Sequence, residues 1–212
     1  MKNIKKVLKE IRLKINKFGN KRRNKQLNSK DFSIISNNCY AGIIYQYLGL
    51  KYNTPTIGLF FFSDEYIRFL ENFEFYIHQK LEFIKTEDSK YYNELVKMGY
   101  NKAIIGKLSD IEIVFLHYSS EEEALEKWTR RCERLSKNII FKFNDQNLCS
   151  YEDIKRFDKL PFPNKIFFSA KKYDEIQSCI WLKNYKNKDY IKEDYYSGHK
   201  YFNIIEYINK IL

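Results

Sequence analysis

From residue 31 onward, short apolar segments of β type alternate with amphipathic segments of helical type, and this alternation constrains the fold of the 212-residue chain more than any other feature. The expected strands cover residues 32–36, 55–62, 111–116, 139–143, 166–168 and 179–182. The expected helices are a run that ends at residue 48, and residues 64–83, 90–98, 120–136, 150–157 and 202–212. Such alternation favours a parallel sheet covered on both faces. We therefore expect an α/β protein with three α/β/α layers and a mostly parallel or mixed central sheet.

The net charge of +11 is concentrated at the N-terminus. Residues 1–30 contain twelve of the 38 Lys and Arg residues and a single acid, Glu10, whereas the other residues hold 26 basic and 26 acidic side chains. Apolar residues recur in this arm with the spacing of a helix face, at Ile4, Val7, Leu8, Ile11, Ile15 and Phe18. Gly19 and Asn20 are expected to end that helix. The sequence thus predicts a basic amphipathic arm over residues 1–30 and a single, neutral α/β domain over residues 31–212.

Three roles suit such an arm. It can lie among the headgroups of an anionic membrane surface, to which each basic residue contributes about 1 kcal/mol. Its apolar face can instead pack on the domain and leave the lysines in solvent. Nucleic acid is the least favoured partner, because the neutral domain shows no nucleic-acid module. The chain has neither an apolar run of about 18 residues nor the apolar core of a signal peptide, so we expect a cytoplasmic protein, peripheral at the inner face of the cell membrane.

Four cysteines and three histidines are scattered along the chain, without the spacing of a disulfide framework or of a zinc site. We therefore expect reduced thiols and no metal. The sequence lacks the glycine-rich motifs of nucleotide-binding folds, the nucleophile motif of α/β-hydrolases and the zinc-protease motif. It also lacks an Asp-x-Asp pair of the kind that holds the metal in many glycosyltransferases. No cofactor can be named from these observations.

Polar or reactive side chains follow five of the expected strands, where ligands bind in open α/β sheets. They are Asn37, Asn38 and Cys39, then Ser63 and Asp64, then His117 and Tyr118, then Asn144 and Asp145, and finally Ser169. We expect a site where these side chains meet, although strand ends are also polar for reasons of solvation alone.

The turn after the first strand is the most informative of these places. A helix that begins there would direct free N–H groups and its positive dipole end toward an anion, and the small residues Ala41 and Gly42 would let a ligand approach the backbone. A thiol at that position would have a lowered pKa. Cys39 is therefore a candidate nucleophile with His117 as its base. The alternative is that Cys39 is a small buried residue that shapes the turn.

The helix after His117 is expected to place Trp128 in the core and three arginines on other sides. Arg130 and Arg134 lie one turn apart and can clamp a phosphate or carboxylate. Glu126 and Glu133 can instead pair with them on the helix surface. We expect Arg130 or Arg131 to contact the phosphates of a donor.

Three segments together resemble the bacterial "domain of unknown function 1919" family. They are Ser36-Asn-Asn-Cys-Tyr-Ala-Gly42, Leu48-Gly-Leu-Lys-Tyr-Asn-Thr-Pro-Thr-Ile-Gly-Leu59, and Phe115-Leu-His-Tyr118 with the following Glu123-Ala and Trp128-Thr-Arg-Arg131. The resemblance extends from about Asp31 to the C-terminus. It implies a three-layer α/β fold and a role in exopolysaccharide or capsule biosynthesis, but no reaction. Tyr40 and Ala41 stand where the family usually has Trp and Gly. A weaker likeness to capsule-locus acetyltransferases rests on Asn38-Cys39 alone.

These observations lead to two expectations of function. The first is a transferase of cell-surface polysaccharide assembly that takes an activated sugar or acyl donor at the cytoplasmic membrane face. Cys39 and His117 would be catalytic, and the substrate-binding residues would be Asn37, Asn38, Gly42, Asp64, Arg130, Arg131 and Asn144. The second is a non-catalytic module that binds a glycan or nucleotide in a polysaccharide locus, since an aromatic content of 17% also suits sugar stacking.

Overall fold

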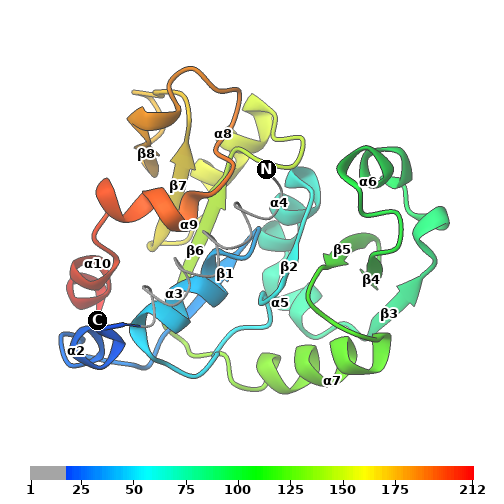
Figure 1. Cartoon of the computed structure of the whole chain (residues 1–212), viewed down its shortest axis with the longest axis horizontal. Helices are drawn as coiled ribbons and strands as arrows, with labels where there is room; N and C mark the ends of the chain where they lie inside the picture. Colours follow the sequence, from blue (N-terminus) through cyan, green and yellow to red (C-terminus); the bar gives the residue numbers. More distant parts are fainter. Residues whose placement is uncertain (1–17) are drawn as a thin grey trace.

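The computed structural model describes residues 18–212, except for the side chains of residues 196 and 197 (Figure 1). Four strands form a parallel sheet in the order β1-β6-β7-β8. They are β1 (Ser33–Ser36), β6 (Ile139–Asn144), β7 (Lys165–Ser169) and β8 (Cys179–Trp181). In register, Ser33 pairs with Ile139 and Phe141 with Lys165. The expected α/β class with a mainly parallel sheet is confirmed.

A second sheet is antiparallel and has the order β2-β5-β4-β3. Its strands are β2 (Leu59–Phe60), β3 (Leu81–Ile84), β4 (Ile104–Leu108) and β5 (Ile111–Phe115). Residues 55–62 and 111–116, expected as strands of the central sheet, therefore contribute to this second sheet instead. Only Ser109 and Asp110 connect β4 to β5, and a two-residue connection can join antiparallel strands but not parallel ones. Ser109 adopts a positive φ of 55°, as such tight hairpins require.

The helices that flank the sheets largely follow the sequence periodicity. They are α2 (Asn20–Asn24), α3 (Tyr40–Leu48), α4 (Ser63–Glu71), α5 (Phe73–Ile77), α6 (Tyr92–Met98), α7 (Glu121–Cys132), α8 (Tyr151–Lys159), α9 (Asp194–Ser197) and α10 (Ile204–Ile211). Short 3₁₀ turns cover Thr86–Asp88, Lys183–Tyr185 and Gly198–Lys200. The expectation of one helix over 64–83 is wrong beyond α5, because its last residues form β3. Ser120 caps α7 by accepting a hydrogen bond from the Glu123 amide at 3.2 Å.

Hydrophobic clusters lie on both faces of the parallel sheet, because successive side chains of a strand point to opposite faces. On one face, Ile35 and Phe143 pack with side chains of α4, α7 and α8 and with β5 of the second sheet. On the other, Ile34 and Phe168 pack with α3 and α10. Trp128 is buried in the first cluster, as expected. The three-layer arrangement thus follows from the alternation within β1, β6 and β7 (Figure 1).

Residues 20–28 are docked on the domain rather than extended from it. The Arg23 side chain donates to the Tyr47 carbonyl at 2.7 Å, and Leu27 is buried. The Asn209 side chain of α10 donates to the Gln26 carbonyl at 2.7 Å. The expected amphipathic helix of the arm lies almost entirely outside the described residues. Within residues 18–212, no helix combines the length and apolar character that crossing a membrane requires.

Candidate functional site

A buried ion pair lies at the centre of the molecule. Lys142, near the end of β6, pairs with Asp194 at the start of α9, and neither side chain is exposed to solvent. The Lys142 ammonium also donates to the side-chain oxygens of Asn37 at 3.3 Å and Asn38 at 3.0 Å. Burial lowers the pKa of Lys142, and the nearby charge of Asp194 opposes this shift. The lysine thus connects the ends of β1 and β6 to a helix that follows much later in the chain.

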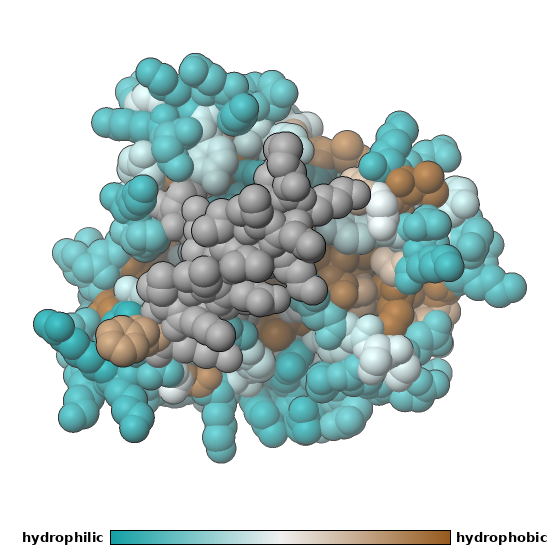
Figure 2. Space-filling view, in the orientation of Figure 1, coloured by the Kyte–Doolittle hydropathy of each residue, from teal (hydrophilic) through white to brown (hydrophobic). Residues whose placement is uncertain are grey.

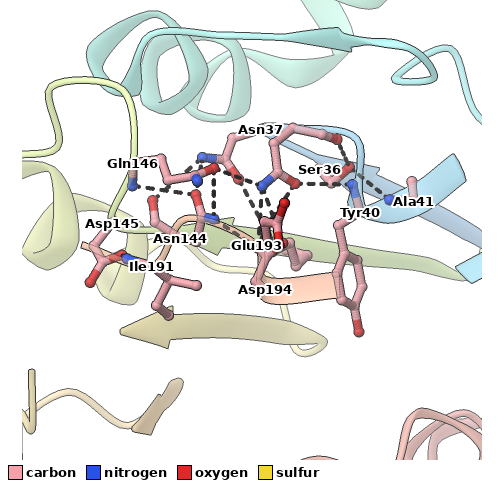
Figure 3. Close-up of polar contacts among 12 residues, drawn as sticks. Ser36, Asn37, Tyr40, Ala41, Asn144, Asp145, Gln146, Ile191, Glu193 and Asp194 are labelled. Carbon is pink, nitrogen blue, oxygen red and sulfur yellow. Dashed lines mark hydrogen bonds and ion pairs between the residues drawn. The ribbon is translucent and has the colours of Figure 1, made fainter. Parts of the chain in front are cut away.

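Carboxamide side chains surround this pair and satisfy its remaining hydrogen bonds (Figure 3). Asp194 accepts from the Asn144 amide at 2.7 Å and from the Asn38 amide at 3.2 Å. Asn37 donates to Asn144 at 2.8 Å, and Asn38 donates to Gln146 at 3.1 Å. We call this set, Asn37, Asn38, Lys142, Asn144, Gln146 and Asp194, the polar frame. Asn37 and Asn144 are fully buried in it, so their contribution is to hold the site together.

The polar frame fixes the first turn of α3. Oδ1 of Asn38, which accepts from Lys142, also accepts from the Tyr40 amide at 3.0 Å. The Ser36 hydroxyl accepts from the Ala41 amide at 3.2 Å. Cys39 occupies the N-cap position between these two contacts. A buried network with satisfied partners is rigid, and the backbone of Cys39 is therefore held in one place.

Asp145 anchors the segment that leads into α9. It accepts from the backbone amide of Ile191 at 2.8 Å (Figure 3). It also accepts from the backbone amide of Ala170 at 2.7 Å and from the Ser169 hydroxyl at 3.2 Å. Burial raises the pKa of Asp145 above its usual value. The polar residues that follow β6 and β7 thus do lie together, but their hydrogen bonds are made to other groups of the protein.

Four of the sequence-predicted residues line one cavity of about 530 Å³, namely Cys39, Gly42, His117 and Arg131. This volume lies within the range of ligand-binding pockets, roughly 300–1,000 Å³. Its wall comes from the start of α3, from the segment before β2, from the segment after β5 and from α7. Two distant parts of the sequence therefore bring a thiol and an imidazole to the same space.

His117 reaches this cavity through a close backbone contact with Gly58. The amides of Leu116 and His117 both donate to the Gly58 carbonyl, at 2.9 and 3.1 Å. Gly58 has a φ of 68°, and a Cβ atom there would lie 3.2 Å from Cβ of His117. Both the conformation and the space favour glycine at this position. The sequence prediction had assigned His117 to the edge of a common sheet, whereas it follows β5 of the second sheet.

A second cleft of about 660 Å³ continues from the first cavity. Cys39, Tyr100, Leu116 and Tyr195 line both spaces, so the thiol lies where they join. The second cleft has several apolar walls: Phe60, Phe62, Met98, Leu116 and Leu148. Figure 2 shows apolar surface beside α6 on this face of the molecule. A ligand that extends through both spaces would pass Cys39.

Two of the predicted binding residues lie elsewhere. Asp64, in the first turn of α4, forms an ion pair with Arg156 of α8 at 2.7 Å. Arg130 pairs with Glu126 on the exposed side of α7 at 3.0 Å, which is the surface alternative considered for it. Neither residue lines the two connected spaces.

The remaining cysteines have surroundings that suppress their reactivity. All four cysteines are present as thiols. Burial raises the pKa of Cys132 to about 12 and that of Cys179 to about 11, and it raises the pKa of Cys149 further. These thiols stay protonated near neutral pH. Within the part of the chain that the structure describes, no group of three or more His, Cys, Asp or Glu side chains is placed to hold a metal ion.

Sequence reasoning missed Lys142, Gln146 and Asp194. One signal was present for the lysine, because Lys142 interrupts the apolar run of residues 139–143 in a strand expected to be buried on both faces. A buried lysine requires a partner of opposite charge. The sequence alone does not show that this partner is Asp194.

The fold and the cavity define the class of the protein: it is an α/β protein in which Cys39 caps the N-terminus of α3, the helix that follows strand β1 of the parallel sheet. The chain belongs to the family described as "Domain of unknown function (DUF1919)", whose model matches residues 10–211. It is 31% identical over 196 residues to an "Uncharacterized protein" of Haemophilus influenzae, a match that covers 90% of this chain and 89% of that protein. The resemblance drawn from the three sequence segments is thus confirmed as to family.

Proposed function

We propose that the protein is a group-transfer enzyme that acts on an activated acyl or sugar donor at Cys39, with His117 as the base. The observation that carries this proposal is that Cys39 and His117 line one cavity of about 530 Å³. Cys39 is also the N-cap residue of α3, where the helix dipole favours a thiolate. Burial raises the pKa values of the three other thiols.

An acyl donor suits a thiol nucleophile. In this scheme His117 takes the proton of Cys39, and the thiolate attacks the carbonyl carbon of the donor. A thioester forms and the leaving group of the donor departs with a proton. An acceptor hydroxyl, deprotonated by His117, then takes the acyl group and releases the Cys39 thiol. With a sugar donor, His117 would instead deprotonate the acceptor hydroxyl directly, and the acceptor oxygen would bond to the anomeric carbon as the activating group of the donor departs.

Assignment to cell-surface polysaccharide assembly is the part of the proposal that rests on family resemblance. Lipid-linked glycans and activated donors meet at the cytoplasmic face of the membrane, and the basic arm would hold the enzyme there. This part has its own test, which is flotation of the full chain and of a chain lacking residues 1–17 with anionic and neutral vesicles. Loss of binding to anionic vesicles on truncation is expected, whereas equal flotation of both chains would refute a membrane role for these residues.

The test of the reaction compares Cys39→Ala and His117→Gln with Cys132→Ala as the matched control. Iodoacetamide at neutral pH should label Cys39 before the other three thiols, and His117→Gln should slow that labelling. The glycan of cells that carry Cys39→Ala should lose its modification, while Cys132→Ala cells keep it. Full modification with both Cys39→Ala and His117→Gln would refute the mechanism.

A binding module without catalysis is the second candidate, and one observation favours it. Aromatic side chains, among them Tyr40, Tyr47 and Phe202, line a further cavity of about 280 Å³, which shares Ile43 and Tyr195 with the cavity of Cys39. Aromatic rings can stack on sugar rings. An unreactive Cys39 together with stabilisation of the protein by a sugar would support this function over transfer. A thermal-shift screen with acetyl-coenzyme A, nucleotide sugars and simple sugars distinguishes the two.

A further inference from the structure

Arg131 is a buried cation with no counter-charge among the residues that the structure describes. Only 7% of this residue is exposed, and no carboxylate of residues 18–212 lies within ion-pair distance of its guanidinium. Its neighbours on α7 differ, since Arg130 pairs with Glu126 and Lys127 pairs with Glu123. A buried charge normally has a partner of opposite sign. Arg131 lines the cavity of Cys39, so the cavity is where such a partner can enter.

Two tyrosines hold the guanidinium at this position. Nη1 of Arg131 donates to the Tyr118 hydroxyl at 2.8 Å, and that hydroxyl in turn donates to the Ile57 carbonyl. The guanidinium carbon lies 5.3 Å from the centre of the Tyr52 ring. The hydrogen bond to Tyr118 uses one of the five donors of the guanidinium. The other donors are therefore available on a side chain whose direction is already fixed.

A second donor lies across the same cavity. The first amides of a helix have no carbonyl partner within it, and in α3 those of Tyr40 and Ala41 are bound by Asn38 and Ser36. The Gly42 amide is not bound in this way by any residue that the structure describes, and Gly42 lines the cavity. Gly42 is itself buried, a Cβ atom at this position would lie 3.5 Å from the Ile57 side chain, and both residues line the cavity.

We propose that this cavity binds the diphosphate group of an ester whose apolar or aromatic part occupies the adjoining cleft. Phosphate oxygens would accept from the Arg131 guanidinium and from the Gly42 amide at the positive end of α3. The remainder of the ligand would pass Cys39 and lie against Phe60, Phe62 and Leu116. The inference deepens the proposed function, because it names the chemical class of the donor, but binding itself does not require the reaction at Cys39.

Two sources can supply this chemistry, a nucleotide derivative and a prenyl lipid. The full chain is titrated by calorimetry at low salt with inorganic pyrophosphate, uridine diphosphate and farnesyl diphosphate. Because a charge-assisted hydrogen bond contributes a measurable part of the binding free energy, Arg131→Gln should weaken each probe by about 10- to 100-fold. Arg130→Ala is the matched control, since it removes a cation from the same helix outside the cavity, and it should bind as the parent does.

The variants separate the possible results. Tyr118→Phe removes the hydroxyl that orients Arg131 and should weaken binding less than Arg131→Gln does. If Arg131→Gln does not fold, Arg131→Lys, which keeps the positive charge, is titrated in its place. Tighter binding of uridine diphosphate than of pyrophosphate would support a nucleotide ligand, and tighter binding of farnesyl diphosphate would support a lipid ligand.

Three results would overturn the proposal. The first is that no probe binds, and the second is that Arg130→Ala and Arg131→Gln lose the same amount of binding affinity. The third is that all three probes bind with equal affinity, which would leave no role for the cleft. If the parent binds the probes and shows no transfer, the diphosphate site stands while the proposed function fails.

Discussion

Replacement of Lys142 by methionine should destabilise the protein strongly. The variant leaves the Asp194 carboxylate fully buried without its cation, and breaking a buried pair from one side costs about 3–5 kcal/mol. Asp194 keeps hydrogen bonds from Asn38 and Asn144, which place the expected loss near the lower limit, about 3 kcal/mol. For a domain of this size that corresponds to a decrease in Tm of about 6–12 °C.

The double variant Lys142→Met with Asp194→Asn provides the control. It removes both charges and keeps an amide acceptor beside Asn38 and Asn144, so it should recover at least half of the stability that Lys142→Met loses. Urea unfolding followed by tryptophan fluorescence measures Lys142→Met, Asp194→Asn and the double variant. A loss below about 1 kcal/mol in Lys142→Met, or a double variant as unstable as the sum of the single ones, would refute the role given to the pair.

Three further results are expected. Gly58→Ala should lower the free energy of unfolding by about 1–2 kcal/mol because of the positive φ at this position, and it should also displace His117 and lower activity. Gly99→Ala, at a φ of 80° with open space around it, should lower the free energy of unfolding without lowering activity. Equal activity of the two variants would contradict the role given to Gly58. Ser120→Ala should lower the free energy of unfolding by about 1 kcal/mol, because the cap of α7 is lost. Alkylation of Cys132 should accelerate with pH up to about pH 12 without an earlier plateau, as its raised pKa keeps the thiol protonated; a plateau near pH 9 would exclude this.

The parallel sheet and most helices could be predicted because their signals are local. The second sheet could not. Residues 81–84 continue an amphipathic pattern that reads as helix, and residues 104–108 contain Gly106, which weakens a strand signal. The structure shows why glycine stands there, since a Cβ atom would lie 2.5 Å from the Phe115 ring and 2.8 Å from Leu81. That contact depends on strand pairing, which a single sequence does not display.

The candidate site was predicted in part, and partly for a different reason than expected. Cys39 and Gly42 follow β1 as the rule for parallel sheets requires. His117 reaches the same cavity from an antiparallel strand through its contact with Gly58. The partnership of Lys142 with Asp194 joins two distant segments, and neither local pattern nor spacing indicates it.

The docking of α2 on the domain affects how the protein would be oriented on an anionic membrane surface. The basic residues of the arm fall into two groups, because those of α2 belong to the folded body and those of residues 1–17 precede it. Lys21 and Arg22 are exposed on α2 and Lys25 is exposed directly after it. The helix α2 lies next to α10 at one corner of the molecule (Figure 1). If the arm binds an anionic surface as proposed, these fixed cations turn that corner toward it. The protein would then approach the membrane in one preferred orientation, with the cleft at a defined angle to the lipid.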